Sequence, residues 1–177
     1  MVKSVSVVRE TKVDSKGRKV ESRVVLIPEQ IKKIAGAQIF VEEDAGAAID
    51  FPNASYKNAG AVICSRDEAL GKDLVLGVKE TRLEDFLKLG GNIFMSFQHF
   101  AASRERTAAA LRTPATFIAL ETIAELNNGL PSFPCLAPMS EAAAKVIARH
   151  ADEYAVIGAH YDHLGNPVAV LSREVPS

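Results

Sequence analysis

The stretch DLVLGVKETRLEDFLKLGGNIFMSFQHF, residues 73–100, predicts a β-strand, an α-helix and a second β-strand in succession. Apolar side chains dominate residues 74–78 and residues 92–97, which are the two predicted strands. Between them, residues 82–89 have the mixture of apolar and charged side chains of an amphipathic helix, and a pair of glycines ends that helix. Strands that a helix connects in this way run parallel, so their carboxyl ends lie at the same edge of a sheet.

Each of the two predicted strands is followed by a polar residue, Lys79 in the first case and His99 in the second. Open parallel sheets bind their ligands at the carboxyl edge of the strands. A lysine and a histidine at that edge therefore predict a site for a small anionic molecule. A structural interpretation stands beside this one, in which Lys79 is a solvated strand end and His99 is a helix-capping or core histidine.

The rest of the chain continues the alternation of strands and helices. Further strands are predicted at residues 4–8, 38–41, 61–64, 116–120, 154–159 and 168–171. Helices or helical turns are predicted at residues 30–35, 45–51, 53–58, 103–111 and 140–150, and the proline-rich residues 130–138 are predicted to be a loop. This pattern predicts an α/β fold with an open, mostly parallel sheet flanked by helices, Rossmann-like or flavodoxin-like. We expect a single domain over residues 1–177, with residues 151–177 as an atypical C-terminal strand pair.

Composition and charge exclude several classes of protein. The 177 residues are 47% hydrophobic and 24% charged, and the formal net charge is −1, which is typical of a globular domain. Basic residues form no block, so we expect no nucleic-acid partner. No apolar run is long enough to cross a bilayer, and the first residues lack the apolar core of a signal peptide, so we expect no membrane partner and a cytoplasmic location. Cys64 and Cys135 are expected to be buried reduced thiols.

Seven groups of residues follow one another in an order that resembles a known family. They are Arg9-Glu10-Thr11-Lys12 followed by Glu21-Ser22-Arg23-Val24 and Pro28; Val41-Glu42 with Ala45-Gly46; Phe51 and Tyr56 with Ala59-Gly60-Ala61; Asp73-Leu74-Val75 with Val78-Lys79-Glu80; Phe97-Gln98-His99-Phe100-Ala101; Leu120-Glu121-Thr122; and Ala137-Pro138-Met139-Ser140-Glu141. Together they resemble the N-terminal, substrate-binding domain of the alanine dehydrogenase and proton-pumping transhydrogenase family. Saccharopine dehydrogenases are similar in the lysine and histidine positions.

The resemblance implies a site for an amino acid or a 2-oxo acid. Arg23 matches the family's carboxylate-binding arginine, whose planar guanidinium suits a bidentate contact. Lys79 matches a lysine that holds the substrate and polarises its carbonyl or imine group, and His99 matches the general acid/base histidine. Three further residues match positions that line the family's cleft: Glu121, Met139 and Ser140. For Glu121 a structural role is an equal alternative.

One departure from the family changes the expected chemistry. Family members continue into a second domain with a G-x-G-x-x-G fingerprint for the nicotinamide cofactor, and the printed sequence contains no such fingerprint. We therefore expect no cofactor in this chain, with NAD(P) present only if a partner chain supplies the nicotinamide-binding domain. Three functions remain open: a stand-alone enzyme that uses acid/base or imine chemistry on a small carboxylate-bearing substrate, the substrate half of a split dehydrogenase or transhydrogenase, and a non-catalytic binding module.

The C-terminal segment contains a second candidate site. Residues 156–165 are similar to the first zinc-ligand stretch of two-zinc aminopeptidases, and His160, Asp162 and His163 have a spacing that suits one metal ion. The default interpretation is a polar turn between two strands that complete the sheet, with no metal. In a chain without the family's second domain, we also expect the face that would meet that domain to be buried in a homodimer.

Overall fold

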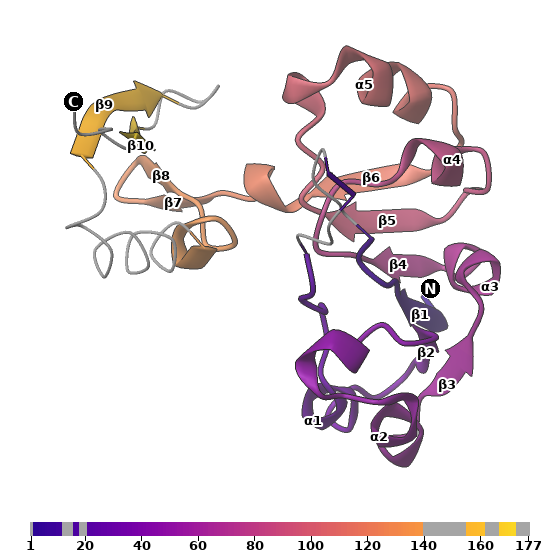
Figure 1. The fold of residues 1–177 in the computed structure, drawn as a ribbon. Helices are drawn as coiled ribbons and strands as arrows, with labels where there is room; N and C mark the ends of the chain where they lie inside the picture. Colours follow the sequence, from indigo (N-terminus) through magenta and orange to yellow (C-terminus); the bar gives the residue numbers. More distant parts are fainter. Residues whose placement is uncertain (1, 12–15, 18–20, 140–154, 162–166, 173–177) are drawn as a thin grey trace. The chain divides into compact units, whose positions relative to one another are not determined.

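The computed structural model describes residues 2–11, 16–17, 21–139, 155–161 and 167–172. Its contacts divide the chain into two compact units, residues 1–121 and residues 122–177. The first unit contains a six-stranded sheet with helices connecting its strands (Figure 1). This α/β architecture with an open parallel sheet confirms the fold class predicted from the sequence.

The six strands lie in the order β3-β2-β1-β4-β5-β6, and every neighbouring pair is parallel. The strands are β1 (Ser4–Val7), β2 (Gln38–Glu42), β3 (Val62–Cys64), β4 (Leu74–Leu76), β5 (Ile93–Ser96) and β6 (Thr116–Ala119). The chain reverses its direction of progress across the sheet between β3 and β4, because β4 returns to the far side of β1. Crevices for ligands form at such a point in open parallel sheets.

Short helices connect these strands. They are α1 (Pro28–Ile31), α2 (Asn53–Asn58), α3 (Arg66–Leu70), α4 (Leu83–Phe86) and α5 (Arg104–Ala110), with 3-10 turns η1 (Ala47–Ile49), η2 (Phe100–Ala102) and η3 (Leu120–Thr122). Serines begin two of the helices: the hydroxyl of Ser65 accepts a hydrogen bond from the Glu68 N–H, and that of Ser103 accepts one from the Arg106 N–H. Each serine satisfies a backbone donor that the first helical turn leaves unpaired.

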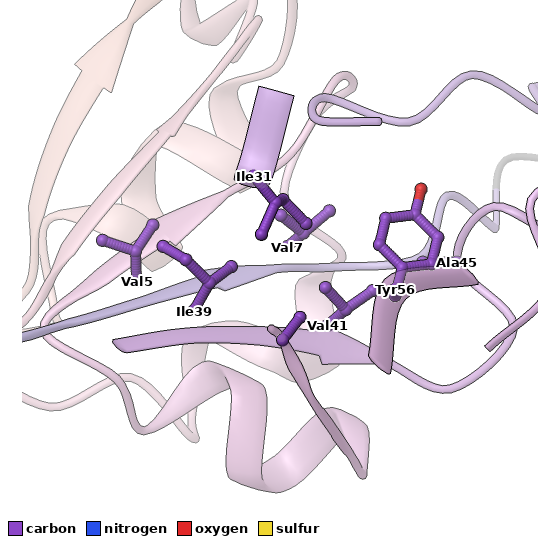
Figure 2. Close-up of a cluster of buried hydrophobic side chains, with 8 residues drawn as sticks. Val5, Val7, Ile31, Ile39, Val41, Ala45 and Tyr56 are labelled. Atoms are coloured by element: carbon purple, nitrogen blue, oxygen red, sulfur yellow. The ribbon is translucent and has the colours of Figure 1, made fainter. Parts of the chain in front are cut away.

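Side chains alternate between the two faces of the sheet, and each face has its own apolar cluster. On one face Val7 and Val41, both fully buried, pack with Ile31 of α1 and Tyr56 of α2 (Figure 2). On the other face the buried cluster includes Val75 and Phe94 of the strands together with Leu70 of α3 and Phe86 of α4. The alternating period of the strands therefore produces a sheet that is covered on both sides.

The second unit contains two hairpins. Strands β7 (Glu125–Asn127) and β8 (Leu130–Ser132) pair antiparallel, and so do β9 (Ala155–Tyr161) and β10 (Pro167–Ser172). Asn128 and Gly129, between β7 and β8, both have positive φ angles, of 52° and 80°. Two-residue hairpin loops of this kind favour Asn-Gly, because both residues tolerate the left-handed conformation.

The structure corrects several predicted elements. Residues 130–138 are not all loop: β8 includes Pro131, and a proline is tolerated in a two-stranded ribbon where its missing N–H is not required. Pro28 begins the helix predicted before Gly36, as a proline can in a first helical turn, but this helix ends at Ile31 rather than at residue 35. Strands β9 and β10 form the expected C-terminal pair, but among the described residues they pair only with each other, as a separate two-stranded sheet, and do not complete the six-stranded sheet. The helix predicted at residues 140–150 lies outside the described residues. Helix α3 was not predicted.

None of the helices in the described part of the chain is both long and apolar enough to cross a membrane. The single domain predicted over residues 1–177 stays a prediction beside the two units that the contacts define.

Truncation of a buried leucine tests the core on the α3 side of the sheet. Leu70 is fully buried in α3, so Leu70→Ala leaves a cavity and is expected to lower the free energy of unfolding by about 3 kcal/mol. Leu87, which follows α4, is 93% exposed. Leu87→Ala is therefore expected to change the free energy of unfolding by no more than about 0.5 kcal/mol. Urea denaturation followed by circular dichroism measures both values, and equal effects would contradict the assigned core.

Candidate anion site at the carboxyl edge of the sheet

Lys79 and His99 lie at the carboxyl ends of two neighbouring strands, as the sequence predicts. Strands β4 and β5 pair in parallel from Leu74 opposite Ile93 onward, and the hydrogen bonding continues beyond the strands to the Phe97 N–H, which donates to the Val78 carbonyl. Lys79 and His99 therefore lie at the same edge of the sheet. Each is partly exposed, so a ligand at this edge can reach their side chains.

A buried glutamate holds the backbone at Lys79. One carboxylate oxygen of Glu10, which follows β1, accepts hydrogen bonds from the Val78 N–H at 2.6 Å and the Lys79 N–H at 3.2 Å. Burial raises the pKa of Glu10, and these two N–H donors offset part of that rise. The Glu10 carboxylate thereby supplies an acceptor for two backbone N–H groups that the end of β4 would otherwise leave without a hydrogen bond.

A second buried glutamate holds the backbone at His99. The carboxylate of Glu121, which follows β6, accepts hydrogen bonds from the Gln98 N–H at 3.1 Å and the His99 N–H at 2.6 Å. His99 itself adopts the left-handed conformation, with φ 49° and ψ 41°, which is uncommon for a residue other than glycine. Glu121 therefore has a clear structural contact, which was one of the two alternatives for this residue.

The imidazole of His99 lies between an aromatic ring and a carboxylate. Its ring stacks on Phe97 with centroids 6.2 Å apart, and its Nδ1 is 3.5 Å from an oxygen of Glu80. Nδ1 is buried and makes no hydrogen bond to any described residue, although 38% of the side chain is exposed. A small movement of either side chain would form the Nδ1–Glu80 hydrogen bond, which leaves Nε2 for a ligand.

A cavity of about 200 Å³ opens beside these strand ends. Its cationic lining residues come from four segments of the first unit: Arg9, Arg66, Lys79, Arg82 and Arg106. Glu10 and Glu80 are its acidic lining residues. The excess of cations predicts a preference for anionic ligands. Neither Arg23 nor His99 is among the described residues that line this cavity, although His99 contacts its lining through Glu80.

A buried ion-pair network forms one wall of the cavity. Asp85 is fully buried and accepts hydrogen bonds from the guanidinium groups of Arg66 and Arg82. Burial by itself raises the pKa of Asp85, and the hydrogen bonds from Arg66 and Arg82 lower it by more, so the pKa lies below its usual value. Arg66 also donates to Glu42 at 2.9 Å and to the Arg9 carbonyl at 3.0 Å. These bonds fix α3 and the segment after β4 against the end of β1.

Arg23, the predicted carboxylate-binding residue, is held by a neighbouring carboxylate. Its Nε and one terminal nitrogen donate to the two oxygens of Glu21, at 3.0 and 2.6 Å. The hydrogen bond from Arg23 lowers the pKa of Glu21 to about 2. Arg23 is about half exposed and also interacts electrostatically with Glu10, the glutamate that binds the Lys79 N–H. Its role as a carboxylate anchor stays a prediction.

The remaining predicted site residues are placed as follows. Met139 is half-buried in the second unit, and Ser140, Asp162 and His163 lie outside the described residues, while His160 belongs to β9. No group of three or more histidine, cysteine, aspartate or glutamate residues within the described ranges could hold a metal ion. The metal-site alternative at residues 160–163 therefore stays a prediction.

The cysteines differ from each other in their surroundings. Both are free, and Cys64 is buried as predicted, but Cys135 is only partly buried, which corrects the prediction for that residue. Burial raises the pKa of Cys64 to about 11, so its thiol stays protonated at neutral pH.

Sequence reasoning missed Glu10 as a backbone ligand and Arg66, Arg82 and Arg106 as cavity residues. Glu121 directly follows a predicted strand and Glu10 lies two residues after one, and a glutamate so close to the end of a strand is a signal that indicates a backbone ligand at both positions. The sequence around the three arginines does not indicate a role in the cavity. They lie on short helices and turns, and contacts with residues distant in sequence decide how these segments pack.

Comparison with known proteins identifies the family to which this fold and site belong. Residues 7–143 match the family model described as "Alanine dehydrogenase/PNT, N-terminal domain". The chain belongs to this family, and the resemblance inferred from the sequence is confirmed.

Individual relatives agree with this assignment. The chain is 34% identical over 144 residues to alanine dehydrogenase 1 of Staphylococcus aureus, an alignment that covers 80% of this chain and 36% of that protein. An L-alanine dehydrogenase structure superposes with a TM-score of 0.68 at 29% identity, over 87% of this chain and 44% of that one. A transhydrogenase from Sinorhizobium meliloti shares the fold, with a TM-score of 0.69 at 20% identity, over 94% of this chain and 49% of that one. The chain thus spans about a third of the length of the curated relative.

Removing the Glu21 charge tests the contribution of the Glu21–Arg23 pair. The pKa of Glu21 falls from 4.5 to about 2 on folding, so its stabilising contribution is complete above pH 4.5 and is lost as the pH falls toward 2. Because Arg23 is half exposed and solvent screens the pair, we expect Glu21→Gln to lower the free energy of unfolding at pH 7 by about 1 kcal/mol. Urea denaturation at pH 7 and pH 2.5 measures the difference between variant and wild type, and a difference that does not shrink at pH 2.5 would contradict the pairing.

Neutralising Glu121 tests its contact with the His99 backbone. A glutamine has a single acceptor oxygen and no charge, so Glu121→Gln is expected to lower the free energy of unfolding by about 1–3 kcal/mol and to increase hydrogen exchange at the His99 amide. Glu43→Gln, at an exposed turn position, is the matched control and should change neither quantity. An unchanged exchange rate at His99 in Glu121→Gln would contradict the proposed contact.

Proposed function

We propose that this chain binds a small amino acid or 2-oxo acid at the carboxyl edge of its sheet and moves protons at the carbonyl or imine group without a nicotinamide cofactor. The observation that supports this proposal is the fixed placement of Lys79 and His99 at adjacent strand ends by the carboxylates of Glu10 and Glu121. Two groups with different chemistry are thereby held ready at one edge before any ligand binds, and such preorganisation is what catalysis by positioned groups requires.

Lys79 supplies the positive charge. Its backbone is bound by Glu10, whereas its ammonium group has no hydrogen-bond or ion-pair partner among the residues that the structure describes. An unpaired ammonium in a cavity attracts the carboxylate or the carbonyl oxygen of a ligand. It also stabilises the negative charge that develops on that oxygen when a proton leaves the adjacent carbon.

His99 supplies the proton acceptor and donor. The Phe97 ring and the Glu80 carboxylate restrain the imidazole, and its exposed part is open to a ligand. With Nδ1 directed to Glu80, the neutral imidazole has Nε2 as the group that takes a proton from the ligand and returns it. In this mechanism the Lys79 ammonium stabilises negative charge on the ligand's oxygen, and His99 takes a proton from the ligand's carbon or nitrogen and returns it.

The names of the relatives favour a second candidate function. The family match and the 34% identical protein of Staphylococcus aureus are described as alanine dehydrogenases, and this chain covers 36% of the latter. In this alternative, the site binds the substrate of an amino-acid dehydrogenase or transhydrogenase, and NAD(P) is bound by a nicotinamide-binding region on another chain. A binding module without chemistry is the third alternative, and the homodimer stays a prediction.

Substitution of Lys79 and His99 separates these functions. Proton exchange at C3 of pyruvate in D₂O, followed by NMR without nicotinamide, reports the proposed chemistry, and calorimetry reports binding. Lys79→Ala is expected to weaken binding at least tenfold because it removes the unpaired cation. His99→Ala is expected to slow exchange by about 100-fold with little change in binding.

Lys57→Ala, an exposed lysine on α2, is the matched control and should behave as wild type. Wild-type behaviour of both Lys79→Ala and His99→Ala would contradict the site. Binding without proton exchange would favour the binding module, and turnover that requires added NAD(P) and a second chain would favour the split dehydrogenase.

A further inference from the structure

The cavity beside Lys79 contains a second cation that the proposed function does not use. Five cationic side chains line this cavity, but two of them, Arg66 and Arg82, are already hydrogen-bonded to carboxylates of the protein. The charges that remain uncommitted decide what kind of anion the cavity can hold, because a guanidinium that is saturated with protein acceptors offers few hydrogen bonds to a ligand.

Two of the arginines are committed to protein carboxylates, and a third is largely solvated. Arg66 donates through all three of its nitrogens, to Asp85, to Glu42 and to the Arg9 carbonyl. Arg82 donates through Nε and one terminal nitrogen to Asp85. Arg9 makes no side-chain hydrogen bond to a carboxylate of the described residues: its Nε lies 3.9 Å from Glu42, and 41% of its side chain is exposed, so water solvates its charge without a ligand.

Arg106 is different, because no carboxylate in the described part of the chain binds it. It is the third residue of α5, and its Nε donates to the Thr81 carbonyl at 3.3 Å. Its two terminal nitrogens have no hydrogen-bond partner among the described residues, although the side chain is half-buried and lines the cavity. The Nε bond restrains the guanidinium group and leaves the edge formed by the terminal nitrogens available.

Apart from the solvated Arg9, Lys79 and Arg106 are thus the two cations of this cavity without a carboxylate partner among the described residues, and they come from different segments, the end of β4 and helix α5. A ligand with a single anionic group satisfies one of them and leaves the other partly buried without a counter-charge. A ligand with an anionic group at each end satisfies both, and about 200 Å³ is a volume for a molecule of only a few carbon atoms.

We propose that the cavity takes a small dicarboxylate, with the reacting end at Lys79 and the distal carboxylate on Arg106. This inference rests on the proposed function, because it names the substrate class of the same site. The planar edge of the Arg106 guanidinium matches the two oxygens of a carboxylate, and two parallel hydrogen bonds of this kind discriminate by geometry as well as by charge. Arg106 is accordingly the specificity-determining residue of the site.

Matched pairs of 2-oxo acids test this inference directly. 2-Oxoglutarate and 2-oxopentanoate share a five-carbon chain and differ only in the distal carboxylate, and oxaloacetate and 2-oxobutyrate are the corresponding four-carbon pair. In calorimetry with the full chain, we expect at least one dicarboxylate to bind about tenfold more tightly than its partner, which is the effect of one charge-assisted contact.

Variants on one helix assign the preference to Arg106. Arg106→Gln is expected to bind the two members of the preferred pair equally, with the affinity for the monocarboxylate unchanged, and Arg106→Lys is expected to keep part of the preference. Arg104→Gln, on an exposed residue of α5 that does not line the cavity, is the matched control and should keep the full preference. Circular dichroism and thermal melting verify that each variant is folded.

The outcomes distinguish this inference from the proposed function. If wild type binds both members of each pair equally and Lys79→Ala weakens both, the proposed function stands and the dicarboxylate inference is overturned. A preference that persists in Arg106→Gln overturns the assignment to Arg106. Inorganic phosphate that binds more tightly than either dicarboxylate, and only when Arg106 is present, overturns the substrate class. Binding of none of the four acids overturns both proposals.

Discussion

The backbone N–H groups at the carboxyl ends of the parallel strands need acceptors, and buried glutamates from the neighbouring strands provide them. Glu10 follows β1 and binds N–H groups at the end of β4, whereas Glu121 follows β6 and binds those at the end of β5. Glu42, at the end of β2, binds the Arg9 N–H after β1 at 2.8 Å. An unpaired buried N–H group costs about as much as a lost hydrogen bond, so each of these contacts stabilises the edge at which the candidate site lies.

The same contacts determine where the candidate site residues lie. Lys79 and His99 are each bound at their own backbone N–H, so the glutamate that binds the strand end also fixes the Cα from which the candidate side chain projects. For His99 the fixed backbone is in the left-handed region, a conformation that costs free energy and persists only where the surroundings enforce it. Stability and site geometry therefore depend on the same hydrogen bonds.

Sequence alone predicted the parts of this arrangement that depend on local pattern. The apolar runs on either side of a helical segment predicted β4 and β5, and their parallel pairing brought Lys79 and His99 to one edge. The prolines of residues 130–138 predict a loop, whereas the Asn128-Gly129 turn favours the hairpin of β7 and β8 that the structure contains. The arginine network could not be predicted, since the contact of Arg66 with Asp85 joins residues 19 apart through the packing of two short helices.

The direction in which each carboxylate points explains how a site with so many acidic neighbours keeps cations that no carboxylate of the described residues binds. Glu10 and Glu121 direct their oxygens at backbone N–H groups, and Asp85 directs its oxygens at Arg66 and Arg82. None of these carboxylates pairs with the Lys79 ammonium or with the terminal nitrogens of Arg106 in the described structure. A buried carboxylate that is satisfied in this way is not available to a cavity cation, so these acidic neighbours do not neutralise Lys79 or Arg106. The proposal of a ligand with two carboxylates therefore rests on the number of cations without a protein carboxylate rather than on the total charge of the surrounding residues.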